Sequence, residues 1–363
     1  MLSAGIVGLP NVGKSTLFNA LGTNARAEAA NFPFCTKKSN VGLVAVPDDR
    51  LEVLAKIGKS QQIVPTRVEF VDIAGLIKGA SKGEGMGNEF LGNIRNCDAI
   101  VQVVRCFEND DIIHVMDYVD PVRDIEVIGL ELSLADLAQV ERRMERTRKQ
   151  AKNNKEAQIE LSALEKLHAH LDRGQPARTC PLTDEEKAAI APLNMLTIKP
   201  LIYCANVNEN DLATGNKWVE QVKAVASKEN AEVVVVSAQV ESELIDLSPE
   251  ERQDYLDSLG VKEGGLKSLI RATYKLLGLR TYFTVGEKET RAWTIKAGMK
   301  APQAAGVIHS DFEKNFIRAE TISYEDLVSA GSMANARAKG LVRSEGKDYI
   351  VQEGDVMLFL TSA

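Results

Sequence analysis

The segment Gly8-Leu9-Pro10-Asn11-Val12-Gly13-Lys14-Ser15 constrains the fold of this chain more than any other feature of its sequence. It fits the pattern G-x-x-x-x-G-K-[ST] and lies between a predicted strand ending at Ile6-Val7 and a predicted helix over Lys14–Leu21. Glycines let the backbone curve around phosphates, and N–H groups at the helix start point toward them. We therefore expect a nucleotide-binding loop in which Lys14 reaches the β- and γ-phosphates and acts in catalysis. The loop residues expected to contact the nucleotide are Asn11, Val12, Gly13, Lys14, Ser15 and Thr16.

Two further segments are typical of the surroundings of a nucleotide's phosphates. Val68-Glu69-Phe70-Val71-Asp72 predicts a strand that ends in an acid, and Gly75 follows shortly after it. Asp72 would join Ser15 in the Mg²⁺ shell, and Gly75 would act as a hinge that senses the γ-phosphate. Thr36 lies in a stretch without clear periodicity and could close over the same ion, although its spacing alone gives this role little support.

Apolar patterning divides the 363 residues into parts. The first third alternates strand-like runs, such as Val41–Val46 and Ala99–Val104, with helical segments, which predicts an α/β domain with a mostly parallel sheet. From Val122 to about Leu171, apolar residues recur at spacings of three and four, which predicts an inserted helical hairpin with a break at Asn153-Asn154. The composition changes again near Arg280, where a small α+β module is expected.

The overall composition favours a cytoplasmic protein. No apolar run approaches the roughly 20 residues that span a bilayer, and the N-terminus lacks the basic start of a signal peptide. Scattered cysteines without metal-ligand spacing indicate reduced thiols. The net charge of −7 argues against a uniformly basic nucleic-acid binder, and we expect no DNA specificity.

The motifs GLPNVGKS, NFPFCT and DIAGLIKGAS together resemble those of the Obg-related branch of the translation-factor GTPases, and the whole chain resembles the YchF family of Obg-like ATPases. The resemblance implies a Ras-like P-loop domain formed by residues 1–127 and 200–280, a helical coiled-coil insert over 128–199 and a TGS domain over 281–363. A TGS domain is a ubiquitin-like β-grasp module. Its signatures are matched by segments that begin at Trp293, Ile308 and Tyr349.

The expected base contact departs from the guanine-specific N-K-x-D box of this superfamily. The corresponding segment is Asn206-Val207-Asn208-Glu209, in which Val207 replaces Lys and Glu209 is one methylene longer than Asp. A second register, Asn208 to Asp211, starts beyond the predicted strand and is less favoured. A displaced carboxylate discriminates poorly for guanine, and the resemblance implies ATP use, with GTP also bound. Asn206, Val207 and Glu209 would face the base, while Ser237-Ala238 resembles the backbone cap on it.

Leu76 stands where many switch GTPases carry a water-orienting Gln. Since a hydrocarbon side chain cannot align water, either hydrolysis is slow or another group serves. His114, in a polar loop after the fourth strand, could position the water, although a loop histidine without a role is equally compatible. By resemblance, Asn11 could instead help to hold an activating K⁺, although it could also merely cap the loop.

The stretch Gln139–Lys155 carries seven basic and two acidic residues inside an acidic chain. A cationic helix face suits RNA phosphates, although charge runs are usually just solvated. The resemblance implies ribosome association, in which the TGS domain would take part. The leading hypothesis is therefore an ATP-hydrolysing switch that binds RNA or the ribosome. An RNA- or ribosome-binding adaptor with a structural nucleotide and a GTPase of ribosome assembly remain alternatives.

Overall fold

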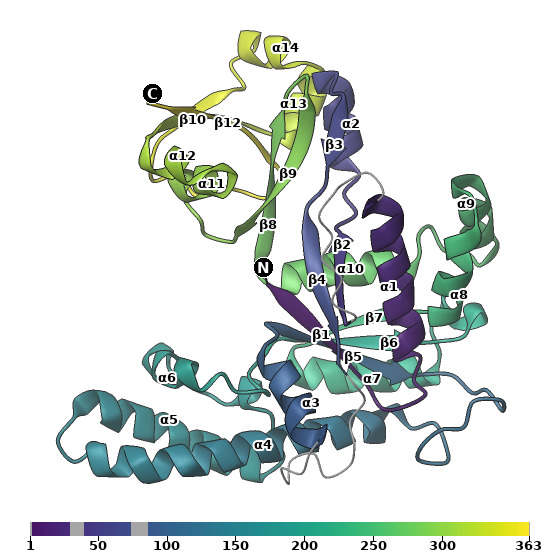
Figure 1. Ribbon diagram of the computed structural model, residues 1–363, viewed down its shortest axis with the longest axis vertical. Coiled ribbons are helices and arrows are strands. Elements are labelled where there is room, and N and C mark those ends of the chain that lie inside the picture. The colour runs from purple at the N-terminus through teal and green to yellow at the C-terminus, as the bar shows by residue number, and fades with distance from the viewer. Residues whose placement is uncertain (1, 30–39, 74–85, 363) are drawn as a thin grey trace. The chain divides into compact units, whose positions relative to one another are not determined.

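A computed structural model describes residues 2–29, 40–73 and 86–362. The chain divides into two compact units, one formed by residues 1–43 and 69–273 and the other by residues 44–68 and 274–363. Each unit contains a six-stranded sheet, and the strands of both sheets other than β11 are labelled in Figure 1.

The first unit is built on a sheet with the strand order β2-β4-β1-β5-β6-β7. Its strands are β1 (Ser3–Val7), β2 (Val41–Ala45), β4 (Arg67–Asp72), β5 (Ala99–Arg105), β6 (Leu201–Asn206) and β7 (Glu232–Val236). The neighbouring strands β4, β1, β5, β6 and β7 pair in parallel, in that order. Every residue of β1, β5 and β6 is buried, as expected of central parallel strands covered on both faces. Because these strands run in one direction, their carboxyl ends meet at one edge, where ligands of such sheets bind.

Helices connect these strands and follow the predicted pattern closely. They are α1 (Lys14–Ala29), α3 (Met86–Arg95), α4 (Pro121–Gln150), α5 (Lys155–Asp172), α6 (Asp184–Ile190), α7 (Lys217–Glu229), α8 (Ala238–Glu243), α9 (Pro249–Ser258) and α10 (Gly265–Leu276). The last residues of α10 belong to the second unit. The predicted α/β class with a parallel sheet and a helical insert is therefore correct.

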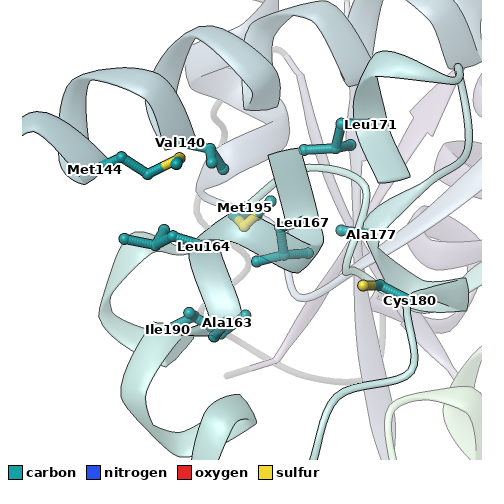
Figure 2. Packing of buried hydrophobic residues seen from close by; sticks show 10 residues of the cluster. All are labelled: Val140, Met144, Ala163, Leu164, Leu167, Leu171, Ala177, Cys180, Ile190 and Met195. Atoms are coloured by element: carbon teal, nitrogen blue, oxygen red, sulfur yellow. The ribbon is translucent and has the colours of Figure 1, made fainter. Parts of the chain in front are cut away.

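The helical insert has an apolar core of its own. Asp120 caps α4 by accepting a hydrogen bond from the Arg123 backbone N–H, and Asn154 caps α5 at the predicted break. Side chains from α4, α5 and the segment that follows them form the cluster in Figure 2, which comprises Val140, Met144, Ala163, Leu164, Leu167, Leu171, Ala177, Cys180, Ile190 and Met195. This core leaves the opposite face of α4 free to carry the basic residues.

The second unit is a mixed sheet with the strand order β11-β10-β12-β8-β9-β3. Its strands are β3 (Gln62–Val64), β8 (Leu279–Val285), β9 (Glu289–Lys296), β10 (Phe316–Ser323), β11 (Arg343–Glu345) and β12 (Asp355–Thr361). Its helices are α2 (Arg50–Gly58), α11 (Ala301–Ile308), α12 (Ser310–Lys314), α13 (Tyr324–Ala330) and α14 (Met333–Ala338). The segment that begins at Tyr349 contributes one bridge to this unit, between Ile350 and Lys300.

The segment 44–68 departs from the expected domain boundaries. We expected it in the nucleotide-binding domain, but it belongs to the second unit. Leu51 and Leu54 of α2 are buried in one apolar cluster with Phe283 and Ile322, and β3 pairs with β9. An amphipathic helix shows that it must bury one face, but its sequence does not indicate which distant sheet covers that face.

Candidate nucleotide-binding site

A cavity of about 960 Å³ lies in the first unit, beside the phosphate-binding loop. Its walls come from that loop, the ends of β4 and β6, the loop after β5, and α8. They are Leu9, Pro10, Asn11, Gly13, Lys14, Ser15, Thr16, Asp72, Phe107, Asn109, Ile112, Asn206, Val207, Asn208, Ala238, Gln239, Ser242 and Glu243. Most of the residues predicted to bind the nucleotide are therefore brought together, although they come from segments more than 200 residues apart.

The conformation of the loop explains its glycines. Gly13 has a φ of +92°, and a Cβ built there would lie 2.2 Å from the Nδ2 atom of Asn206. A Cβ on Gly8 would lie 2.9 Å from a methyl carbon of Val12 and 3.1 Å from the carbonyl oxygen of Val103. Larger residues are therefore excluded at both positions by space, and at Gly13 also by backbone conformation.

The charged groups of the phosphate end lie together. The ammonium group of Lys14, which is 9% exposed, forms an ion pair with the carboxylate of Asp72 at the end of β4. Both residues line the cavity with Ser15. The cavity thus contains a cation, Lys14, that can bind phosphate oxygens. It also contains the hydroxyl of Ser15 and the carboxylate of Asp72, which are hard oxygen ligands of the type that Mg²⁺ prefers.

Asn206 joins the two ends of the site. Its Nδ2 atom donates to the carbonyl oxygen of Val12 over 2.8 Å, and its Oδ1 atom accepts from the backbone N–H of Ala238 over 2.9 Å. The side chain is 4% exposed. Its amide is therefore used to tie the phosphate-binding loop to the start of α8, whereas the sequence predicted a contact with the base.

At the base end, Val207, Asn208 and Ala238 line the cavity, but Glu209 does not. The Glu209 carboxylate instead accepts a hydrogen bond from the Tyr255 hydroxyl over 3.3 Å. Ser237 is buried, and its Oγ accepts from the Val240 backbone N–H, so that it caps α8. We expected Glu209 beside the base. No local pattern indicated a partner 46 residues away.

The second register of the base motif finds no support at this site. Its acid, Asp211, accepts a hydrogen bond over 2.9 Å from the side chain of Asn216, which caps α7. Asp211 is absent from the cavity walls, whereas Asn206 and Val207 of the first register belong to them.

His114 is buried, although we expected an accessible loop residue. It is 5% exposed, its Nε2 atom lies 2.7 Å from Oδ2 of Asp124, and its Nδ1 atom accepts from the backbone N–H of Met116 over 3.0 Å. Since Nδ1 accepts, the proton lies on Nε2 and is donated to Asp124. Asp124, in the first turn of α4, also accepts from Arg123. His114 is not part of the cavity wall.

The loop that carries His114 is fixed by a residue that the sequence analysis missed. Arg105, 2% exposed at the end of β5, donates to the carbonyl oxygens of Phe107, Asn109 and Asn11. Burial lowers the pKa of its guanidinium group. A single charged residue at the end of an otherwise apolar predicted strand was the available signal.

Asn11 contacts the same loop. Its φ is +62°, and its side-chain Nδ2 atom donates to the carbonyl oxygen of Ile113 over 3.1 Å. The phosphate-binding loop is thereby linked to the segment that holds His114. Thr36, Gly75 and Leu76 lie outside the described residues.

Across residues 2–29, 40–73 and 86–362, no three His, Cys, Asp or Glu side chains gather as a metal site would require. A P-loop Mg²⁺ site needs no such cluster, since phosphate oxygens and waters together supply most ligands. Within the same ranges, no helix has both the length and the apolar character needed to cross a bilayer.

Comparison with known proteins places the chain in a family. A model described as 50S ribosome-binding GTPase matches residues 3–129, and the YchF-GTPase C-terminal model, described as a protein of unknown function, matches residues 279–362. The chain is 55% identical to the ribosome-binding ATPase YchF of Bacillus subtilis, with 99% of this chain and 98% of that protein covered. It is 57% identical to the protein of that name from Escherichia coli O157:H7, with 98% of each covered. The structure of the Schizosaccharomyces pombe YchF GTPase is 39% identical and superposes with a TM-score of 0.89, over 99% of this chain and 97% of that one. With its phosphate-binding loop, helical hairpin and C-terminal unit covered end to end, the chain belongs to the YchF family.

Proposed function

We propose that this protein is an ATP-hydrolysing P-loop switch that associates with the ribosome in a nucleotide-dependent way. The observation that carries the proposal is the convergence of Lys14, Ser15 and Asp72 on one cavity that continues to Val207 and Ala238. Such an arrangement can hold the phosphates at one end and the base at the other. The full-length relatives named ribosome-binding ATPases support both the reaction and the partner.

Mg²⁺ fits the residues that are present. Ser15 and Asp72 would hold the ion, and Thr36 would complete its shell. When bound, Mg²⁺ neutralises charge on the β- and γ-phosphate oxygens. Lys14, now paired with Asp72, would turn its ammonium group to the phosphates, and Gly75 would respond to the γ-phosphate.

Two residues of this chain are candidates for promoting hydrolysis. His114 could position the attacking water after its hydrogen bond to Asp124 is broken, because the residue is buried while that bond is present. Asn11 could help to hold K⁺ beside the phosphates, with its amide oxygen as the ligand. The buried position of His114 favours slow basal turnover, which keeps an adaptor with a slowly hydrolysed nucleotide as the second candidate function.

For the base, we propose ATP over GTP. Val207 provides an apolar contact where a lysine would be expected, and Glu209 is directed to Tyr255. Relatives in this family are named both ATPase and GTPase, so the preference has to be measured. Titration of the protein with ATP and GTP, with and without Mg²⁺, tests it, and tenfold tighter binding of GTP would overturn it.

The basic face of α4 is the proposed contact with ribosomal RNA, together with the C-terminal TGS unit. All seven basic residues in the stretch are exposed, namely Arg142, Arg143, Arg146, Arg148, Lys149, Lys152 and Lys155. Arg143 pairs with Glu160 and Arg148 lies 3.9 Å from Glu165, and the others extend the cationic face. Ribosome affinity should be compared with ATP, with ADP and with a non-hydrolysable analogue. Identical affinities would favour the adaptor over the switch.

A further inference from the structure

Three residues from separate elements of the first unit meet beside the base end of the cavity. The Tyr255 hydroxyl, from α9, lies 2.6 Å from Oε2 of Glu243 at the end of α8. The same hydroxyl lies 3.3 Å from Oε2 of Glu209, in the turn after β6. Glu243 lines the cavity, and Glu209 directly follows the lining residue Asn208.

A single tyrosine proton is shared by this arrangement. A phenol donates one hydrogen bond, whereas each carboxylate only accepts. The short hydrogen bond to Glu243 and, to a smaller extent, burial raise the pKa of the Tyr255 hydroxyl, so the proton is retained at neutral pH. Because the proton lies between two negative groups, it offsets their repulsion and holds both side chains at one place.

The chemistry of guanine makes the position of Glu209 important. Guanine presents two donors, an N1–H and a 2-amino group, to an acid at this point of the fold, whereas adenine has an acceptor at N1 and only hydrogen on C2. The extra methylene of Glu209 makes a bidentate contact less favourable, but a flexible side chain of that length could still accept from at least one donor. The length of Glu209 alone is therefore insufficient to exclude guanine.

We propose that Tyr255 is a positioning residue for base specificity, because its hydroxyl keeps the Glu209 carboxylate away from the base and so disfavours guanine. This inference rests on the proposed preference for ATP. Tyr255 is not among the residues that line the cavity, so it would act through Glu209. A purely structural role, in which the hydroxyl only joins α9 to α8, would affect all nucleotides alike.

The test uses the full chain with Tyr255→Phe, and dissociation constants for ATP, GTP and ITP measured by calorimetry in Mg²⁺. The ratio of the GTP to the ATP constant should fall about tenfold, the value of one hydrogen bond to a charged group. ITP should gain less than GTP because it lacks the 2-amino donor. The matched control is Ser258→Ala, which removes another hydroxyl from α9. In the described structure that hydroxyl donates to the carbonyl oxygen of Tyr255, so its loss should leave the ratio at the wild-type value.

A double variant, Tyr255→Phe with Glu209→Ala, identifies the acceptor. The wild-type ratio should return, since the freed carboxylate is gone. Because the GTP and ATP dissociation constants of a variant come from the same sample, partial loss of folded protein does not alter their ratio in either variant. An unchanged ratio in Tyr255→Phe, or a shift that persists in the double variant, overturns the inference while a wild-type preference for ATP leaves the proposed function standing. A wild-type preference for GTP instead overturns the proposed base preference and this inference with it.

Discussion

Replacing Asn206 by Ala should destabilise the first unit and weaken nucleotide binding together. The substitution leaves the carbonyl oxygen of Val12 and the N–H of Ala238 without the partners they have at 2.8 and 2.9 Å. Both groups lie in a buried setting. Since an unsatisfied buried polar group costs about 1–3 kcal/mol and two are left, the free energy of unfolding should fall by about 2–6 kcal/mol. ATP and GTP should lose affinity by a similar factor, because the amide holds the loop and not the base.

Urea unfolding can be followed in the first unit alone. The chain has two tryptophans, Trp218 in α7 and Trp293 in β9, so a Trp293→Phe background leaves a reporter only in the first unit. Asn208→Ala is the matched control, since its half-buried side chain makes a long contact of 3.5 Å with the carbonyl oxygen of Glu108. A change in Asn206→Ala of less than about 0.5 kcal/mol, typical of surface sites, would refute the reasoning.

Three other predictions concern separate parts of the chain. Asp124→Asn should raise ATP turnover, measured as phosphate release, by up to about tenfold because it weakens a charged hydrogen bond to His114; unchanged or lower turnover would count against release of that histidine. Arg142→Glu with Arg146→Glu should reduce ribosome co-sedimentation. The slope of the logarithm of ribosome affinity against the logarithm of salt concentration should become shallower by about two, and an unaltered slope would exclude this face as the RNA contact. The Glu186 pKa is lowered from 4.5 to about 2, chiefly by a hydrogen bond from a lysine. Its stabilising contribution is therefore complete above pH 4.5 and lost as the pH falls toward about 2, a loss that Glu186→Gln should remove from urea titrations across this range.

Local patterns predicted the elements of the first unit well, because their signals are local. The predicted strands over Val41–Val46 and Ala99–Val104 agree with β2 and β5 to within one residue, and the hairpin breaks where Asn154 caps the next helix. Near the C-terminus the same method was weaker. It did not indicate β10, in which exposed and buried residues do not alternate regularly. It also indicated one helical stretch, near Gln303–His309, where the structure has several short helices.

The sequence by itself determined the phosphate end of the site. Gly8, Gly13 and Lys14 lie close together in the chain, and the strand before them and the helix after them fix their geometry. Tertiary structure alone decided the rest, because it depends on which distant side chains share a buried space. That packing assigned residues 44–68 to the C-terminal unit, buried His114 against Asp124, and directed Glu209 to Tyr255. A hydrogen bond between residues far apart in sequence exists only once the sheet has brought their elements together, so no local spacing could indicate it.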